Sequence, residues 1–106
     1  MKIAVLGAGA MGSIYGGHLS LNNDVYMVDK KQELVDKINN DGLKLFENDT
    51  DVIYNPTAVT DSKNIGEVDL VILFVKSLYS RTALMENSHI IGGNTYVMTL
   101  QNGAGH

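Results

Sequence analysis

Short apolar runs alternate with amphipathic segments along most of the chain, and this alternation predicts strands that alternate with helices. Between the second helix and the third strand, Leu43–Phe46 and Val52–Tyr54 flank a polar turn and predict an inserted hairpin. Asp61 is placed to cap a turn of helix that runs to Gly66. The predicted strands are Lys2–Leu6, Val25–Val28, Thr57–Thr60, Leu70–Val75 and Asn94–Leu100, and the predicted helices are Ser13–Leu21, Lys30–Asn40 and Leu78–Ile91.

The segment Leu70–Val75 is apolar on both of its faces, which is typical of a central parallel strand that helices cover on each side. Strands and helices that alternate in this order predict an α/β fold, a doubly wound parallel sheet of the Rossmann type with a small inserted hairpin. Right-handed crossovers bring the carboxyl ends of the strands to one edge, where ligands bind in such sheets.

The first predicted strand leads directly into a glycine-rich turn and a helix. In this G-x-G-x-x-G pattern the first glycine allows a sharp turn, the second allows backbone to approach a pyrophosphate, and the third allows close packing of helix on strand. The helix N-terminus adds unpaired N–H groups that favour an anion. A purely structural glycine turn is the alternative. The turn consists of Gly7, Ala8, Gly9, Ala10, Met11 and Gly12.

An acidic residue follows at the end of the next predicted strand, about 20 positions on, as the dinucleotide-binding pattern requires. Asp29 is placed to accept hydrogen bonds from an adenosine ribose, which favours NAD(H) because a carboxylate repels a 2′-phosphate. Lys30 and Lys31 follow directly and are suited to bind that phosphate, which favours NADP(H). The alternative for Asp29 is a plain cap on the second helix.

Composition excludes several classes of function. A chain of 106 residues with net charge -4 and scattered Lys and Arg is one domain without a surface for nucleic acid. The sequence has no cysteine, which fits a reducing cytoplasm, and no apolar run long enough to span a membrane. His18, His89 and His106 show no metal-ligand spacing, so we expect no metal site.

Two further residues follow strand ends at the same predicted edge. Lys76 comes directly after the central strand, and Asn102 with Gly103 comes after the last one. An ammonium group suits an anionic phosphate or carboxylate, and an amide before a glycine allows close approach to a ligand. The alternatives are a solvated lysine at the end of a strand and an ordinary Asn-Gly turn.

Three stretches together resemble the ketopantoate reductase (2-dehydropantoate 2-reductase) family. They are Lys-Ile-Ala-Val-Leu-Gly-Ala-Gly-Ala-Met-Gly at the N-terminus, Asp69-Leu-Val-Ile-Leu-Phe-Val-Lys76 in the middle, and Thr99-Leu-Gln-Asn-Gly-Ala-Gly105 at the end. The resemblance spans the chain and implies that residues 1–106 form the dinucleotide-binding domain, without the helical C-terminal substrate domain of the family. It also implies that Gly7 to Gly12 hold the pyrophosphate, that Lys76 reaches cofactor or substrate, and that Asn102 lies near both.

The family reduces the ketone of 2-dehydropantoate to pantoate with hydride from NADPH, on the route to pantothenate and coenzyme A. The resemblance therefore favours NADP(H), although Asp29 leaves NAD(H) open. It places the proton donor in the second domain, so we expect no catalytic residue in these 106 residues and cofactor binding without turnover. The last predicted strand is apolar on both faces and no predicted helix follows to cover it, so we also expect a homo-oligomer. The alternatives are a stand-alone nucleotide-binding or sensing module, a flavoprotein, and a related dehydrogenase of another 2-oxo acid.

Overall fold

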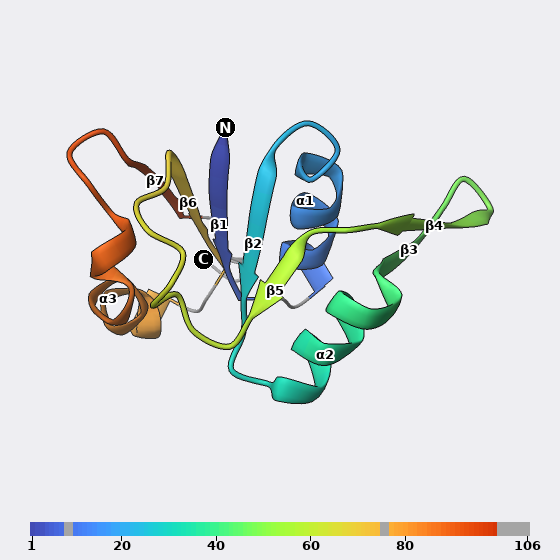
Figure 1. Ribbon diagram of the computed structural model, residues 1–106, viewed down its shortest axis with the longest axis horizontal. Helices are drawn as coiled ribbons and strands as arrows, with labels where there is room; N and C mark the ends of the chain where they lie inside the picture. Colours follow the sequence, from blue (N-terminus) through green and yellow to red (C-terminus); the bar gives the residue numbers. More distant parts are fainter. Residues whose placement is uncertain (8–9, 75–76, 100–106) are drawn as a thin grey trace.

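A five-stranded parallel sheet forms the centre of the computed structural model, which describes residues 1–7, 10–74 and 77–99 (Figure 1). The strand order β5-β2-β1-β6-β7 is that of a doubly wound sheet and confirms the predicted fold class. The strands are β1 (Lys2–Leu6), β2 (Asp24–Val28), β5 (Thr57–Val59), β6 (Leu70–Leu73) and β7 (Tyr96–Thr99), and all neighbouring pairs are parallel.

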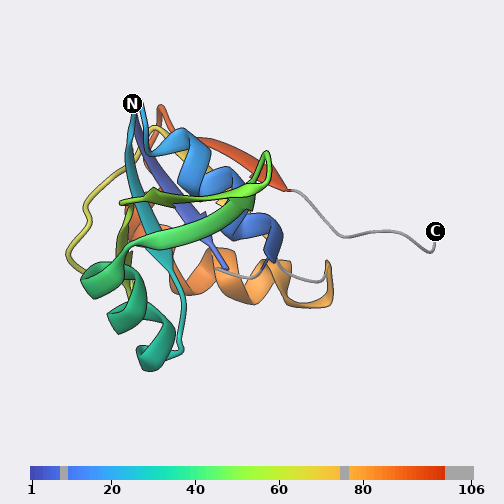
Figure 2. The ribbon, with the colours of Figure 1, turned by 90° about the vertical axis from the view of Figure 1, so that its right-hand side faces the viewer.

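Helices cover both faces of this sheet, as the continuous apolar strands require. Alternate residues of β1 belong to opposite sides: Ile3 and Val5 lie in one core with residues of α2, and Ala4 and Leu6 lie in the other. The helices are α1 (Ala10–Leu19), α2 (Gln32–Asp41) and α3 (Ser77–Glu86), followed by the short 3-10 helix η1 (Ser88–Ile90). Figure 2 shows α3 running crosswise to the strands near their carboxyl ends.

The predicted hairpin is present as β3 (Leu43–Glu47) and β4 (Thr50–Tyr54), which pair in antiparallel register. Its two-residue turn places Asn48 and Asp49 at φ 51° and 64°, a left-handed conformation that these residue types tolerate better than most. The hairpin projects from one side of the molecule beside α1 (Figure 1).

Two predicted helical segments differ from the structure. Residues 61–66 form no helix and contain only a turn at 63–65, because the Asp61 carboxylate accepts the N–H of Lys63 at 3.0 Å, a local bond that competes with helical pairing. The predicted helix Leu78–Ile91 ends at Glu86 and is followed by η1. The Asn87 side chain donates to the Ala83 carbonyl at 2.7 Å and so satisfies one of the last carbonyls of the helix.

Strand register aligns the carboxyl ends at one edge of the sheet. Leu6 pairs with Val28 on one side and with Leu73 on the other, and Leu73 pairs with Thr99. The segments that follow β1, β2, β5 and β6 therefore begin at a common edge, which is where the sequence places the nucleotide site.

Candidate nucleotide site

The turn after β1 is built around a close contact between two glycines. Gly7 has φ +101°, a conformation that side chains rarely adopt, and its N–H donates to the Val28 carbonyl at 3.0 Å. A Cβ atom on Gly12 would lie 2.1 Å from the Gly7 carbonyl oxygen. No side chain fits between these residues, so the turn requires glycine at both positions.

The turn leads from the carboxyl end of β1 directly to a helix N-terminus. The N-terminus of α1 begins at Ala10, directly after the turn, and such a helix end presents unpaired N–H groups to an anion. Ala10 and Met11 form the first turn of that helix. Ala8 and Gly9 lie outside the described residues. The described part of the turn thus places a helix N-terminus at the carboxyl edge of the sheet, where an anionic group could bind.

Asp29 follows β2 at the same edge and is half-buried. Its N–H donates to the Val59 carbonyl at 3.0 Å, and its Oδ1 accepts the N–H of Lys31 at 2.9 Å. The residue at the N-cap position of α2 is Lys31, which makes no side-chain capping bond. Asp29 therefore shapes the turn before the helix, and the interpretation of Asp29 as the helix cap is wrong.

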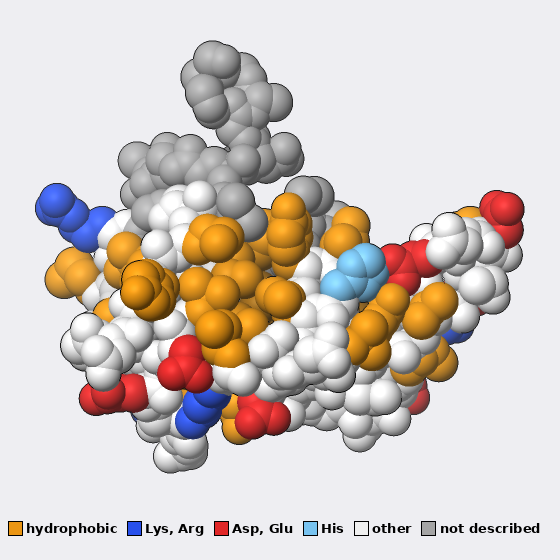
Figure 3. All heavy atoms as spheres, turned by 90° about the horizontal axis from the view of Figure 1, so that it is seen from above, with side chains coloured by type: hydrophobic (Ala, Val, Ile, Leu, Met, Phe, Trp, Pro, Cys, Tyr) orange, Lys and Arg blue, Asp and Glu red, His pale blue; other side chains and the backbone are white. Residues whose placement is uncertain are grey.

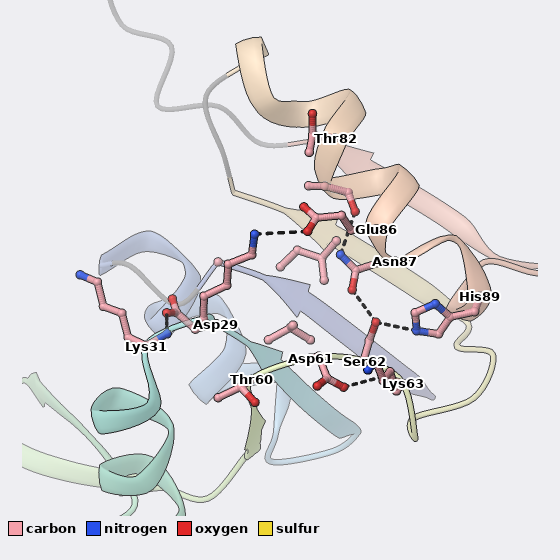
Figure 4. A pocket seen from close by; sticks show the side chains of 15 residues that line it. Asp29, Lys31, Thr60, Asp61, Ser62, Lys63, Thr82, Glu86, Asn87 and His89 are labelled. Carbon is pink, nitrogen blue, oxygen red and sulfur yellow. Dashed lines mark hydrogen bonds and ion pairs between the residues drawn. The ribbon is translucent and has the colours of Figure 1, made fainter.

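A pocket of about 780 Å³ opens beside Gly7 and Asp29 (Figure 4). Its walls come from three segments that are far apart in the sequence. Residues 29–31 follow β2, residues 60–63 follow β5, and the last turn of α3 with η1 forms the third wall. Leu6 and Gly7 also line this pocket, so it adjoins the start of the glycine turn.

Lys30 reaches across this pocket. Its Nζ lies 3.2 Å from Oε2 of Glu86, the last residue of α3 (Figure 4). Both side chains are exposed, with 84% and 49% of their surface accessible. The sequence predicted a phosphate-binding role for Lys30 but gave no sign of Glu86, because the partners are far apart in sequence and on different elements.

A second interaction in the pocket was also missed by the sequence analysis. Ser62 is 1% exposed, and its hydroxyl donates to Oδ1 of Asn87 and lies 2.8 Å from Nε2 of His89. A hydroxyl has one proton, so the bond to His89 requires that Nε2 carries the hydrogen. In this arrangement His89 donates to Ser62, and the cluster anchors the end of α3.

Lys76 and Asn102, the other two predicted binding residues, lie outside the described residues. Their roles at the cofactor or substrate stay predictions from the sequence.

A separate polar cluster joins the hairpin to α1. The Glu47 carboxylate accepts from the Tyr54 hydroxyl and pairs with Nε2 of His18, whose ring lies 5.3 Å from that of Tyr54 between centroids. The hydrogen bond from Tyr54, and then that from His18, lowers the pKa of Glu47. The same bond to Glu47 raises the pKa of Tyr54. His18 thus belongs to a polar cluster between α1 and the hairpin.

The described residues contain no group of three or more His, Cys, Asp or Glu side chains that could hold a metal ion. No helix in the described part of the chain is both long and apolar enough to cross a membrane.

Comparison with known sequences supports the resemblance seen in the motifs. A sequence model of the family described as "Ketopantoate reductase PanE/ApbA" matches residues 3–106. The 2-dehydropantoate 2-reductase of Streptococcus pyogenes serotype M1 is 34% identical over 107 residues, and that of Pyrococcus abyssi is 36% identical over 108 residues. Each match covers all of this chain and 34% of the relative, so the chain spans about a third of their length.

Solved structures give the same result. A putative 2-dehydropantoate 2-reductase from Enterococcus faecalis has a TM-score of 0.84 and 35% identity, over 100% of this chain and 35% of that one. A ternary structure of D-mandelate dehydrogenase with NADH and anilino(oxo)acetate has a TM-score of 0.84 and 39% identity, with the same coverage. The chain belongs to the ketopantoate reductase PanE/ApbA family.

Proposed function

We propose that this chain binds a nicotinamide dinucleotide, with the pyrophosphate over the glycine turn and the adenosine end in the adjoining pocket. The observation that carries the proposal is the place of the tight contact between Gly7 and Gly12, which lies between the carboxyl end of β1 and the N-terminus of α1 and beside the pocket that Gly7 and Asp29 line. The N-terminus of α1 then supplies N–H donors to the phosphates, and Asp29 accepts a ribose hydroxyl.

The bound cofactor supplies the hydride. The residues of this chain bind and orient it, and Lys76 and Asn102, by family resemblance, extend this role toward the nicotinamide and the substrate. We further propose that 2-dehydropantoate is the substrate, as the names of the reductase relatives suggest. The proton donor and the rest of the substrate site belong to the helical C-terminal domain of the family.

A related dehydrogenase of another 2-oxo acid is the second candidate. It is favoured by one observation, the 39% identity with D-mandelate dehydrogenase, in a structure that contains NADH and anilino(oxo)acetate. The two candidates share the cofactor site and differ in the substrate.

The cofactor we favour is NADP(H), because Lys30 and Lys31 flank the ribose position and the family resemblance points to NADPH. Asp29 and the NADH of the D-mandelate dehydrogenase structure support NAD(H) as the alternative. NADP(H) and NAD(H) would bind at the same glycine turn, so only the contacts to the ribose would distinguish the two cofactors.

We also propose that the chain self-associates through β7. This strand lies at the edge of the sheet and all of its residues are exposed, including Tyr96, Val97 and Met98. Figure 3 shows hydrophobic side chains gathered in the middle of the face seen from above. An apolar edge strand with free backbone groups is a ready template for a second copy.

Absorbance at the reduced nicotinamide band, with 2-dehydropantoate added, tests the assignment of roles. We expect the 106-residue chain to bind the cofactor without consuming it. Turnover at a rate typical of enzymes, on the order of 10 per second, would show that the proton donor lies within these residues. A panel of other 2-oxo acids, tested as ligands of the cofactor-bound chain, separates the two candidate substrates.

A further inference from the structure

The ion pair between Lys30 and Glu86 crosses the pocket at the proposed ribose position, and Glu86 is the last residue of α3. We propose that Glu86 is a specificity-determining residue: by holding Lys30, it weakens binding of a 2′-phosphate and so moves the cofactor preference toward NAD(H). This inference rests on the proposed function, because it concerns the adenosine end of the same site.

The geometry puts Lys30 within reach of two competing anions. Its ammonium follows Asp29, the residue that marks the ribose position, and it lies 3.2 Å from Oε2 of Glu86 on the far wall of the pocket (Figure 4). A 2′-phosphate bound beside Asp29 must draw the ammonium away from Glu86. NAD(H), which carries a hydroxyl there, leaves the ion pair in place.

The backbone of Glu86 is held in place by the hydrogen bonds of the next residue, Asn87. Asn87, the next residue, donates to the Ala83 carbonyl at 2.7 Å and accepts from the buried hydroxyl of Ser62. Ser62 belongs to the segment after β5, so this contact ties the end of α3 to the opposite wall of the pocket. The Glu86 backbone is therefore held at the pocket even though its side chain is half exposed.

Local electrostatics also favours the pair. A carboxylate at the C-terminus of a helix faces the negative end of the helix dipole, and the last turn of α3 contains no basic residue. Lys30, from another element, supplies the missing positive charge.

Calorimetric titration of the 106-residue chain with NADPH and with NADH tests the proposal on wild type and Glu86→Gln. An exposed ion pair contributes up to about 1 kcal/mol, so we expect NADPH to bind about fivefold more tightly to the variant. NADH affinity should change less than about twofold, and the gain in NADPH affinity should shrink at high salt. Asp51→Asn, which removes an exposed carboxylate on the hairpin, is the charge-matched control and should change neither affinity.

Lys30→Gln and the double variant show whether Glu86 acts through Lys30. In the Lys30→Gln background, Glu86→Gln should change NADPH affinity by less than about twofold, because the competing ammonium is gone. An equal gain in both backgrounds would overturn the proposal, as would an unchanged NADPH-to-NADH ratio in Glu86→Gln or an equal loss for both cofactors. In each of those cases wild type still binds NADH and the proposed function stands. Wild type that binds neither cofactor overturns both.

Discussion

Gly12 faces the carbonyl oxygen of Gly7 so closely that a Cβ atom at position 12 would lie 2.1 Å from it. The obstacle is backbone, which cannot rotate away as a flexible side chain can. Gly7 itself holds φ +101° and donates to Val28, so the turn has little freedom to shift. This relationship holds the first turn of α1 against the end of β1, at the carboxyl edge of the sheet.

Gly12→Ala should therefore lower the free energy of unfolding. Forced overpacking of this kind costs about 1–3 kcal/mol. Urea unfolding followed by circular dichroism measures the change. Gly93→Ala is the matched control, because a Cβ there meets nothing within 4 Å, and it should leave stability nearly unchanged. Equal effects of the two substitutions would contradict the steric account of the turn.

Lys76→Ala and Asn102→Ala should each weaken cofactor binding with little effect on folding. We expect both side chains to lie at the surface of the crevice, where a substitution changes the free energy of unfolding by within roughly 0.5 kcal/mol. Fluorescence titration with the reduced cofactor, alongside urea unfolding, separates the two effects. Full affinity in both variants would remove these residues from the site.

The stability of the hairpin should depend on pH in the acid range, through the ionisation of Glu47. The pKa of Glu47 is lowered in the folded chain from its ordinary value of 4.5, chiefly by the Tyr54 hydroxyl and then by His18. Its stabilising effect is thus present above pH 4.5 and is lost as pH falls through the lower folded pKa. The thermal midpoint of wild type should fall over this range more than that of Glu47→Gln. Parallel acid profiles for the two proteins would show that the cluster contributes nothing.

Tyr54 gives the opposite dependence at alkaline pH. Its pKa is raised from 10.0 by the bond to Glu47, so the contribution of the neutral hydroxyl is full below pH 10.0 and is lost as pH rises through the folded pKa. Tyr54→Phe should remove this alkaline loss, as followed by the thermal midpoint. Unchanged alkaline behaviour in that variant would contradict the assignment of the bond.

Self-association should depend on β7. Tyr96 is 78% exposed on this edge strand, and Tyr96→Lys places a charge where a second copy would pair. Sedimentation velocity should show the wild type as a dimer or larger assembly, and the variant shifted toward the monomer. Phe46→Lys, at a 72% exposed aromatic on the hairpin, should leave the distribution as in wild type. A monomeric wild type at moderate concentration would exclude the proposed edge contact.

The sequence predicted the sheet and the glycine turn because their signals are local. Each signal lies within a short segment of the sequence: the periodicity of the strands, the spacing of Gly7 and Gly12, and the acidic residue Asp29. The end of α3 was predicted less well. The Asn87 side chain ends the helix by a hydrogen bond to the Ala83 carbonyl, and the sequence around Asn87 gives no sign of that bond. Glu86 and Ser62 were missed for a different reason. Their partners lie on other elements, and only the packed fold brings them together.

Equilibrium binding of NADPH and NADH to wild type and to Gly9→Val tests the central claim most directly. The proposed function places the pyrophosphate at the second glycine of the turn, so a branched side chain there should abolish binding of both cofactors. Gly93→Val, at a glycine with open space around it, is the control and should bind as wild type does. Calorimetry that shows binding to wild type and Gly93→Val but not to Gly9→Val is the predicted result. Undiminished binding to folded Gly9→Val, or no binding to wild type, would contradict a dinucleotide site at this turn.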